Sequence, residues 1–345
     1  MYGLIRKALF LTDPETAHGL ALESLRLGYG VGATGVLFGE QSQPVTVMGL
    51  EFPNPVGMAA GMDKNGDYID ALGSLGFGFV EIGTVTPRPQ AGNPKPRVFR
   101  LEKATAMINR LGFNNKGVDY LVQQAKKRKF KGILGINIGK NFDTPIEKAA
   151  EDYLVCLEKV YPYADYITIN ISSPNTKGLR DLQAADQLDE LLGAINSRRQ
   201  QLAYEYDKRV PLVIKVAPDL EDDQITEIAE VVARNEFDGL IATNTTISRE
   251  EVKGMRHAHE QGGLSGAPVL KKANHVLAAF RAALPAEIAV IGVGGITKGE
   301  DAAEKVKLGA DLVQFYTGFV YRGPDLVRDS LKAISAARAQ VVQQG

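Results

Sequence analysis

The sequence predicts an α/β fold, specifically a (β/α)8 TIM barrel with an N-terminal amphipathic helical extension. From residue 45 onward, short apolar runs alternate with amphipathic helical stretches, which is typical of parallel strands joined by crossover helices. Eight such runs suit a closed barrel better than an open doubly wound sheet, and no G-x-G-x-x-G follows the first run. The expected strands are Val56–Ala59, Phe79–Ile82, Ile133–Ile138, Tyr166–Ile171, Val210–Val216, Gly239–Ala242, Ile288–Val293 and Leu312–Phe315.

Length and composition agree with one large globular domain plus an appendage. The chain has 345 residues, 44% hydrophobic and 23% charged, so we expect an extension over 1–40 and a barrel over 41–345. The net charge of −1, without a sustained basic run, gives no footprint for nucleic acid. The single cysteine, Cys156, excludes an internal disulfide and is expected in a helix core.

Residues 1–40 predict two short amphipathic helices. In the first, Leu4, Ile5 and Leu9 contribute to one apolar face, and Asp13 followed by Pro14 is a helix start signal for the second. These helices either pack on the barrel or form an interfacial membrane foot that admits a lipid-soluble molecule. The sequence contains neither an apolar run of about 18 residues nor a signal-peptide pattern, so we expect a protein exposed to the cytoplasm.

Two further segments interrupt the alternation. Val45–Phe52 is expected to form a hairpin that turns at Met48-Gly-Leu50. Thr84–Gly117 is long and carries four prolines near its start, so we expect it to pass over the barrel mouth.

Polar residues cluster where the predicted strands end, which is where barrel enzymes place their chemistry. The stretch Tyr166–Arg180 is the most informative, because an alternating strand stops at Pro174 and exposes Ser173, Asn175 and Thr176 at its mouth. A local Ser/Asn turn is the alternative interpretation. Strand alternation would point the neighbouring Ser172 away from the mouth.

The last two strands predict a phosphate site. Gly292-Val-Gly-Gly295 and Tyr316-Thr-Gly318 offer backbone amides in the place where barrels commonly bind phosphate, although a tight turn would also use these glycines. The mouth carries Lys64 and Lys215 but little histidine or acid, and no metal-ligand spacing occurs, so we expect no metal. A lysine beside a ring nitrogen can stabilise negative charge on a flavin.

Seven motifs in combination are specific to one family: Ala60-Gly-Met-Asp-Lys64, Glu81-Ile-Gly-Thr-Val-Thr-Pro-Arg-Pro-Gln90, Asn109-Arg-Leu-Gly-Phe-Asn-Asn115, Gly135-Ile-Asn-Ile-Gly139, Asn170-Ile-Ser-Ser-Pro-Asn175, Ala242-Thr-Asn-Thr245 and Gly262-Gly-Leu-Ser-Gly266. On these motifs the chain resembles, over essentially its whole length, class 2, quinone-dependent dihydroorotate dehydrogenases of the bacterial type. The departures are Met62, Leu111 and Thr317, where relatives often carry Leu, Met and Ser.

The resemblance implies one FMN per chain, with dihydroorotate bound beside it. The implied FMN residues are Ala60, Gly61, Thr84, Asn137, Asn170, Lys215, Thr243, Gly266, Gly295, Tyr316 and Thr317. The implied substrate residues are Lys64, which faces the carboxylate, and Asn109, Arg110, Leu111, Gly112, Phe113, Asn170, Asn175, Asn244 and Thr245.

The implied reaction is oxidation of dihydroorotate to orotate in pyrimidine biosynthesis. Ser173 would remove the C5 proton while the C6 hydride passes to the flavin. As a hypothesis, Thr176 and a water relay the proton outward and Phe113 shields the site. A membrane quinone is the implied final acceptor.

The resemblance also gives the extension a role. Residues 1–40 would form a tunnel from the bilayer to the flavin, with His18, Arg100 and Tyr316 as quinone contacts, although His18 could be an ordinary surface histidine. It implies a monomer, peripheral on the cytoplasmic face of a bacterial inner membrane.

Three alternatives stay open at this stage. A fumarate- or NAD-linked dihydroorotate oxidase is the nearest, but Ser173, the extension and the lack of an iron–sulfur cysteine set count against it. A phosphate-binding barrel lyase or isomerase would need an acid/base pair. A flavin-free membrane-binding scaffold would not need polar residues at the strand ends.

Overall fold

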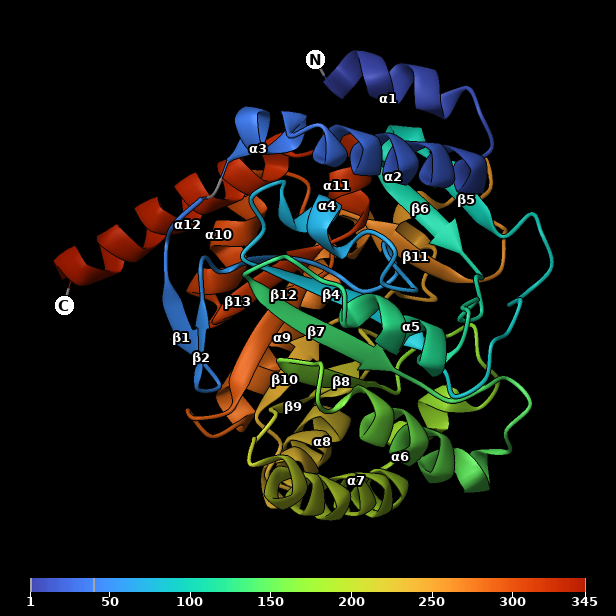
Figure 1. Ribbon diagram of the computed structural model, residues 1–345, viewed down its shortest axis with the longest axis vertical. Helices are drawn as coiled ribbons and strands as arrows, with labels where there is room; N and C mark the ends of the chain where they lie inside the picture. Colours follow the sequence, from blue (N-terminus) through green and yellow to red (C-terminus); the bar gives the residue numbers. More distant parts are fainter. Residues whose placement is uncertain (1, 40, 345) are drawn as a thin grey trace.

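A computed structural model describes residues 2–39 and 41–344, with side chains described as far as residue 340. Eight parallel strands close into a barrel in which each strand pairs with the barrel strands before and after it in the chain, and the last strand pairs with the first (Figure 1). The predicted barrel is confirmed, and each strand agrees with its expected position within a few residues. The barrel strands are β3 (Val56–Met58), β4 (Phe79–Val85), β7 (Ile133–Ile138), β8 (Tyr166–Asn170), β9 (Leu212–Val216), β10 (Gly239–Ala242), β12 (Ala289–Val293) and β13 (Leu312–Phe315).

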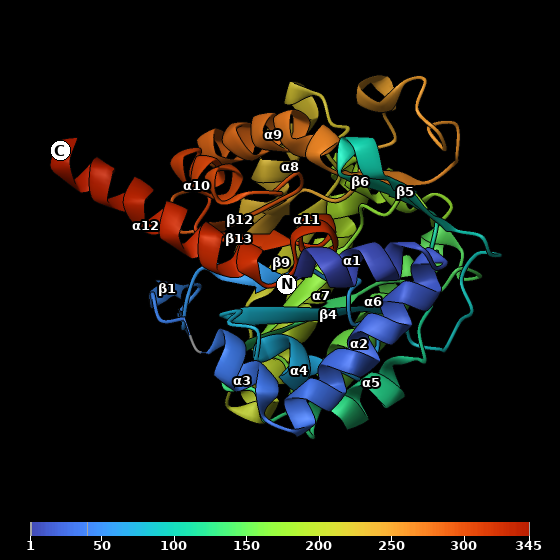
Figure 2. The ribbon, with the colours of Figure 1, turned by 90° about the horizontal axis from the view of Figure 1, so that it is seen from above.

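Helices surround the barrel because each crossover buries one apolar stripe against the strands (Figures 1 and 2). In α8, for example, Ile225, Ile228 and Val232 are buried while the intervening charged residues face outward. The surrounding helices are α4 (Ile69–Gly73), α5 (Val118–Ala125), α6 (Ala149–Val160), α7 (Ala185–Tyr206), α8 (Asp222–Arg234), α9 (Leu270–Ala283), α10 (Gly299–Lys307), α11 (Thr317–Arg322) and α12 (Asp325–Gln344).

A hairpin packs against the apolar interior at the N-terminal end of the barrel. It consists of β1 (Val45–Val47) and β2 (Leu50–Phe52), joined by a turn in which Met48 and Gly49 both have positive φ, as expected. Phe52 is fully buried and meets the Phe79 ring edge-on, with 5.2 Å between the centroids. Because this apolar hairpin fills the N-terminal end of the barrel, a polar site is left to the C-terminal ends of the strands.

The segment between β4 and α5 contributes two strands of a three-stranded antiparallel sheet that the sequence did not predict. Its strands are β5 (Val98–Leu101), β6 (Ala106–Asn109) and β11 (Gly263–Gly266), in the order β11-β6-β5. β11 lies more than 150 positions along the chain from β6, so this pairing is invisible to local patterning.

The extension forms three helices rather than the expected two: α1 (Tyr2–Phe10), α2 (Pro14–Gly30) and α3 (Ala33–Phe38). Asp13 caps α2 as predicted, because its Oδ1 accepts the amides of Glu15 and Thr16 at 3.0 Å each. The Tyr2 hydroxyl donates to the Val320 carbonyl of α11 at 2.7 Å, so α1 is tied to the barrel.

The outer surface of the extension is apolar. The exposed large hydrophobic residues there are Leu4, Ile5, Leu11, Leu20, Leu27, Val31, Val36 and Leu37. Within the ranges that the structure describes, no helix combines the length and apolarity needed to cross a membrane.

Candidate active site

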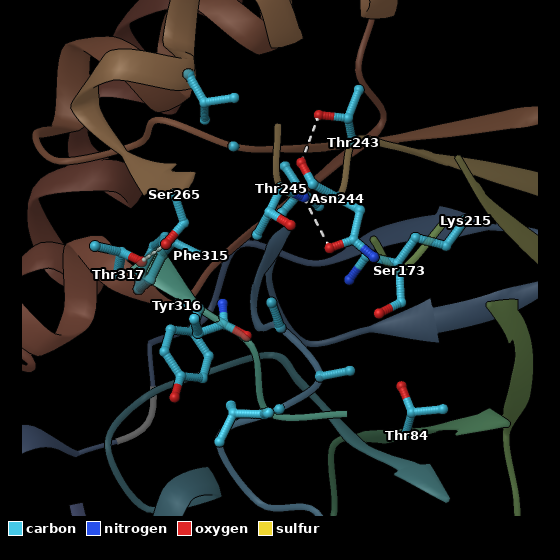
Figure 3. Close-up of a pocket in the computed structure, with 18 of the residues that line it drawn as sticks. Thr84, Ser173, Lys215, Thr243, Asn244, Thr245, Ser265, Phe315, Tyr316 and Thr317 are labelled. Atoms are coloured by element: carbon cyan, nitrogen blue, oxygen red, sulfur yellow. Dashed lines mark hydrogen bonds between the residues drawn. The ribbon is translucent and has the colours of Figure 1, made fainter. Parts of the chain in front are cut away.

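A cavity opens at the C-terminal ends of the barrel strands. It encloses about 1030 Å³ of space, its open mouth included, and residues at or just after the ends of β3, β4, β8, β9, β10, β12 and β13 line it. Thr84, Lys215, Thr243 and Tyr316 surround this space (Figure 3). The position agrees with the site predicted from the polar strand ends.

Most residues expected at the site line this one cavity. They are Ala60, Gly61, Lys64, Thr84, Asn109, Leu111, Gly112, Phe113, Asn170, Ser173, Asn175, Lys215, Thr243, Asn244, Thr245, Gly266, Gly295, Tyr316 and Thr317. Five expected residues do not line it: Asn137, Arg110, Thr176, His18 and Arg100.

Asn137 lies one layer below the cavity floor. Its Oδ1 accepts the Asn170 amide at 3.2 Å, and its own Nδ2 donates to the Glu81 carboxylate at 2.8 Å. The Asn170 amide also donates to the Thr84 hydroxyl at 3.0 Å. Asn137 therefore fixes the amide and hydroxyl that face the cavity instead of facing it directly.

A buried carboxylate occupies the middle of the barrel. Glu81 accepts hydrogen bonds from the Tyr166 hydroxyl at 2.8 Å and from the Gln314 amide at 2.9 Å, and none of the three side chains is exposed. Burial lowers the pKa of the nearby Lys215, and the charge of Glu81 opposes that shift. Sequence reasoning quoted Glu81 within a motif but assigned it no role.

The loop after β8 presents Ser173 to the cavity. The Ser173 hydroxyl oxygen accepts the backbone N–H of Asn175 at 3.2 Å. The hydroxyl's own proton is therefore free for another partner. Ser172, by contrast, is fully buried and does not line the cavity, as expected for a residue turned away from the mouth. Its hydroxyl donates to Asn170 Oδ1 at 3.0 Å and accepts from Asn244 Nδ2 at 2.9 Å.

Lys64 is held by the turn that follows β3. The carboxylate of Asp63 accepts the amides of Gly66 at 2.8 Å and Tyr68 at 2.7 Å, which fixes this turn. Burial lowers the pKa of Lys64 to about 8, while the charge of Glu15 opposes the shift. The cavity thus contains an ammonium with a pKa well below that of an ordinary lysine.

The segment after β6 forms the opposite wall, with Asn109 and Phe113 at the cavity. The side-chain amide of Asn175 (Nδ2) donates to Asn109 Oδ1 at 3.4 Å, which links this wall to the Ser173 loop. Arg110 points elsewhere: it pairs with Glu260 at 2.7 Å and lies over the Phe99 ring at 4.7 Å. Arg110 therefore supports the wall from behind.

Glycines and hydroxyls gather after β12 and β13. The Thr317 hydroxyl donates to the Ser265 hydroxyl at 2.8 Å, and both residues line the cavity (Figure 3). Gly295 has φ +84°, and a Cβ there would lie 2.4 Å from Leu270 Cα, so only glycine fits. Sequence reasoning missed Ser265 because it belongs to the unpredicted strand β11.

The three residues expected to contact a quinone come from different elements: Tyr316 follows β13, His18 lies on α2 and Arg100 on β5. Tyr316 lines the cavity, and burial raises its pKa to about 12. His18 is partly buried on α2, where burial and the Lys64 charge lower its pKa to about 4. Arg100 lies over the Phe10 ring at 4.4 Å and donates to the Thr12 carbonyl at 2.9 Å, so it holds the α1–α2 turn.

Comparison with known proteins is decisive for the family. A family model described as dihydroorotate dehydrogenase matches residues 43–337. The chain belongs to the dihydroorotate dehydrogenase family. This family is flavin-dependent, which agrees with a cavity lined by lysines, amides and a glycine turn.

Relatives within the family are similar over nearly their whole length. The dihydroorotate dehydrogenase (quinone) of Azotobacter vinelandii is 55% identical over 341 residues, which cover 99% of this chain and 98% of the relative. That of Dechloromonas aromatica is 57% identical, covering 97% and 98%. The ligand-free DHODH crystal structure from Eimeria tenella is 39% identical with a TM-score of 0.87, covering 95% and 96%.

Proposed function

We propose that this chain oxidises dihydroorotate to orotate in pyrimidine biosynthesis and passes the electrons to a membrane quinone. Relatives 55% and 57% identical carry the name dihydroorotate dehydrogenase (quinone). The observation that carries the proposal is the Ser173 hydroxyl, which lines one cavity together with Lys64 and four asparagines. An anionic, urea-like ring needs this combination of cation, amide donors and amide acceptors.

FMN is the cofactor that the cavity fits. Backbone amides around Gly295 and the hydroxyls of Thr317 and Ser265 suit its phosphate, and the buried ammonium of Lys215 suits an electron-accepting ring. FMN, when bound, accepts the hydride that leaves C6 of dihydroorotate. Thr84 and Asn170, fixed by Asn137 below, would orient the ring system.

The substrate is held by residues on both sides of the cavity. Lys64 binds the carboxylate, and Asn109, Asn175, Asn244 and Thr245 bind the ring edge. Because amides donate and accept, they match the alternating N–H and C=O groups of the ring. Unpaired amides would penalise analogues that lack these groups.

Ser173 takes the C5 proton. A serine hydroxyl is a weak base, so the proton must pass onward as it is abstracted. Thr176 lies three positions further on the same loop and is buried, which supports it as the next acceptor through a water. The Phe113 ring lines the cavity and excludes bulk solvent.

The extension carries the exchange with the membrane. Its exposed apolar residues, among them Leu4 and Leu11, fit the hydrocarbon side of an interface, with the protein peripheral on the cytoplasmic face of a bacterial inner membrane. Tyr316 and His18 are the polar groups that a quinone would meet between α2 and the cavity. We include a monomeric chain in the proposal.

The test is anaerobic addition of dihydroorotate to purified protein while the visible spectrum is recorded. We expect a flavin band that bleaches and returns on addition of a ubiquinone analogue. A yellow protein that stays yellow contradicts the substrate, and a colourless one that FMN does not reconstitute contradicts the cofactor. If NAD or fumarate restores the flavin band and the quinone does not, the result would favour a fumarate- or NAD-linked dihydroorotate oxidase.

A pair of serine variants tests the base. Ser173→Ala should bind orotate but lose flavin reduction by about 10²–10⁴-fold, which is the usual contribution of a general base. Ser330→Ala is the matched control, because Ser330 is buried in α12 and its hydroxyl has no partner among the described residues. Equal reduction rates in the two variants would remove Ser173 from the reaction.

A further inference from the structure

Arg180 joins the two loops that carry the proposed chemistry. Its Nε donates to the Ser172 carbonyl at 3.1 Å, and its Nη2 donates to the Thr245 carbonyl at 2.8 Å. Ser172 precedes Ser173 in the loop after β8, while Thr245 follows Asn244 in the loop after β10. One planar guanidinium therefore fixes the distance between the two walls of the cavity.

Asp219 anchors this guanidinium. It accepts Arg180 Nη1 at 2.9 Å, the Ile247 amide at 3.0 Å and Lys272 Nζ at 2.9 Å, together with the Thr246 hydroxyl. Burial alone would raise the pKa of Asp219, but hydrogen bonds from Thr246 and Lys272 lower it, so the carboxylate stays charged.

The pair is largely buried, with 20% of the Arg180 side chain and 13% of the Asp219 side chain exposed. Arginine presents its donors in a rigid fork, so one side chain can bond two carbonyls and a carboxylate at once. Lysine has a single nitrogen and cannot span three acceptors in this arrangement.

We propose that Arg180, held by Asp219, is a positioning residue that sets the Ser173 hydroxyl against the substrate-binding segment Asn244–Thr245. Arg180 does not line the cavity, so it acts through the two carbonyls and not through the substrate. The expected kinetic effect rests on the proposed role of Ser173. The coupling of the two loops by Arg180 does not depend on that role.

The kinetic test is stopped-flow reduction of the FMN-loaded enzyme by dihydroorotate. Arg180→Lys should slow flavin reduction by about 10²-fold, because a displacement near 1 Å of a reacting group has that effect. The isotope effect from dihydroorotate deuterated at C5 should increase, while reoxidation of reduced flavin by a quinone stays unchanged. If Arg180 only stabilised the fold, Arg180→Lys would lower the rates of both half-reactions and leave the isotope effect unchanged.

Arg281→Lys is the matched control. Arg281 also donates to backbone carbonyls, those of Ile288 at 2.9 Å and Leu284 at 3.0 Å, but at the N-terminal end of β12 and far from the cavity. In Arg281→Lys, dihydroorotate should reduce the flavin at the wild-type rate. Arg180→Lys within about twofold of this control would overturn the proposal.

Hydrogen exchange read by mass spectrometry tests the coupling without catalysis. In Arg180→Lys, segments 172–180 and 244–249 should lose protection together, and Asp219→Asn should reproduce this if the arginine variant folds poorly. Unchanged protection, or loss in one segment only, contradicts the clamp. Wild-type protein that dihydroorotate does not reduce would instead contradict the proposed function and leave the exchange result standing.

Discussion

The pH dependence of orotate binding is the most direct consequence of the cavity's electrostatics. Burial lowers the pKa of Lys64 from 10.5 to about 8. If the Lys64 ammonium binds the substrate carboxylate, as we propose, affinity is full below pH 8 and is lost as the pH rises through this value. The sign follows because the neutral amine cannot pair with a carboxylate.

The magnitude follows from the same pKa. At pH 7 about nine-tenths of the Lys64 side chains carry a proton, and at pH 9 only about one-tenth do. The dissociation constant of orotate should therefore change little between pH 6.5 and 7.5 and rise by roughly tenfold between pH 7 and 9, about fivefold of it between pH 8 and 9. An ordinary lysine with a pKa of 10.5 would leave it flat throughout.

The assay is titration of FMN-loaded protein with orotate, followed by the perturbation of the flavin spectrum at each pH. Asp63, next in the chain, has a pKa raised by burial to about 6, so it titrates below this window. Lys64→Gln separates Lys64 from the second cavity lysine, Lys215, and should bind weakly with no step between pH 7 and 9. A step that survives in Lys64→Gln, or a flat wild-type curve, would refute the reasoning.

Three further perturbations test the fold at both ends of the barrel and at the extension. Phe52→Ala should lower the free energy of unfolding, measured by urea denaturation, by about 3–5 kcal/mol. Tyr204→Ala is the control: its side chain is 92% exposed, and it should change this free energy by less than about 0.5 kcal/mol. Equal effects would contradict the packing of Phe52 against the barrel. Gly295→Ala should release flavin on gel filtration, because φ +84° disfavours any side chain, and retained flavin would show that the turn relaxes. Glu15→Gln should destabilise by about 1–3 kcal/mol and raise proteolysis within residues 1–40, because Glu15 pairs with Arg97 at 2.9 Å; unaltered cleavage would contradict this tie.

The barrel could be predicted because its strands are short, apolar and buried on both faces, so each one stands out locally. The limits of prediction follow from non-local contacts. Gly263–Gly266 reads as a loop, yet pairs with Ala106–Asn109 across a large sequence separation and brings Ser265 to the cavity. No pattern within either segment indicates that pairing.

Residues expected at the site line the cavity where a strand end positions them, whereas some that were expected only as part of a motif lie elsewhere. Arg110 stands between Asn109 and Leu111, which both line the cavity, and the resemblance therefore placed it there too. Successive residues of an extended segment point to opposite sides, and the partner that holds Arg110 away, Glu260, lies 150 positions later. His18 and Arg100 remain predictions as quinone contacts.

The polar layer inside the barrel opposes the effect of burial on the lysine at the cavity floor. Burying Lys215 alone would favour its neutral form, which could not stabilise negative charge on a flavin. The charge of Glu81 opposes that shift from below, and Asn137, Tyr166 and Gln314 each donate a hydrogen bond to the Glu81 carboxylate. The Asn137 amide is shared between this layer and Asn170 above, so the residues that hold the counter-charge also orient the cavity floor. A barrel interior of uniformly apolar layers would be easier to pack, but it could neither oppose the effect of burial on the Lys215 pKa nor fix the amides above it.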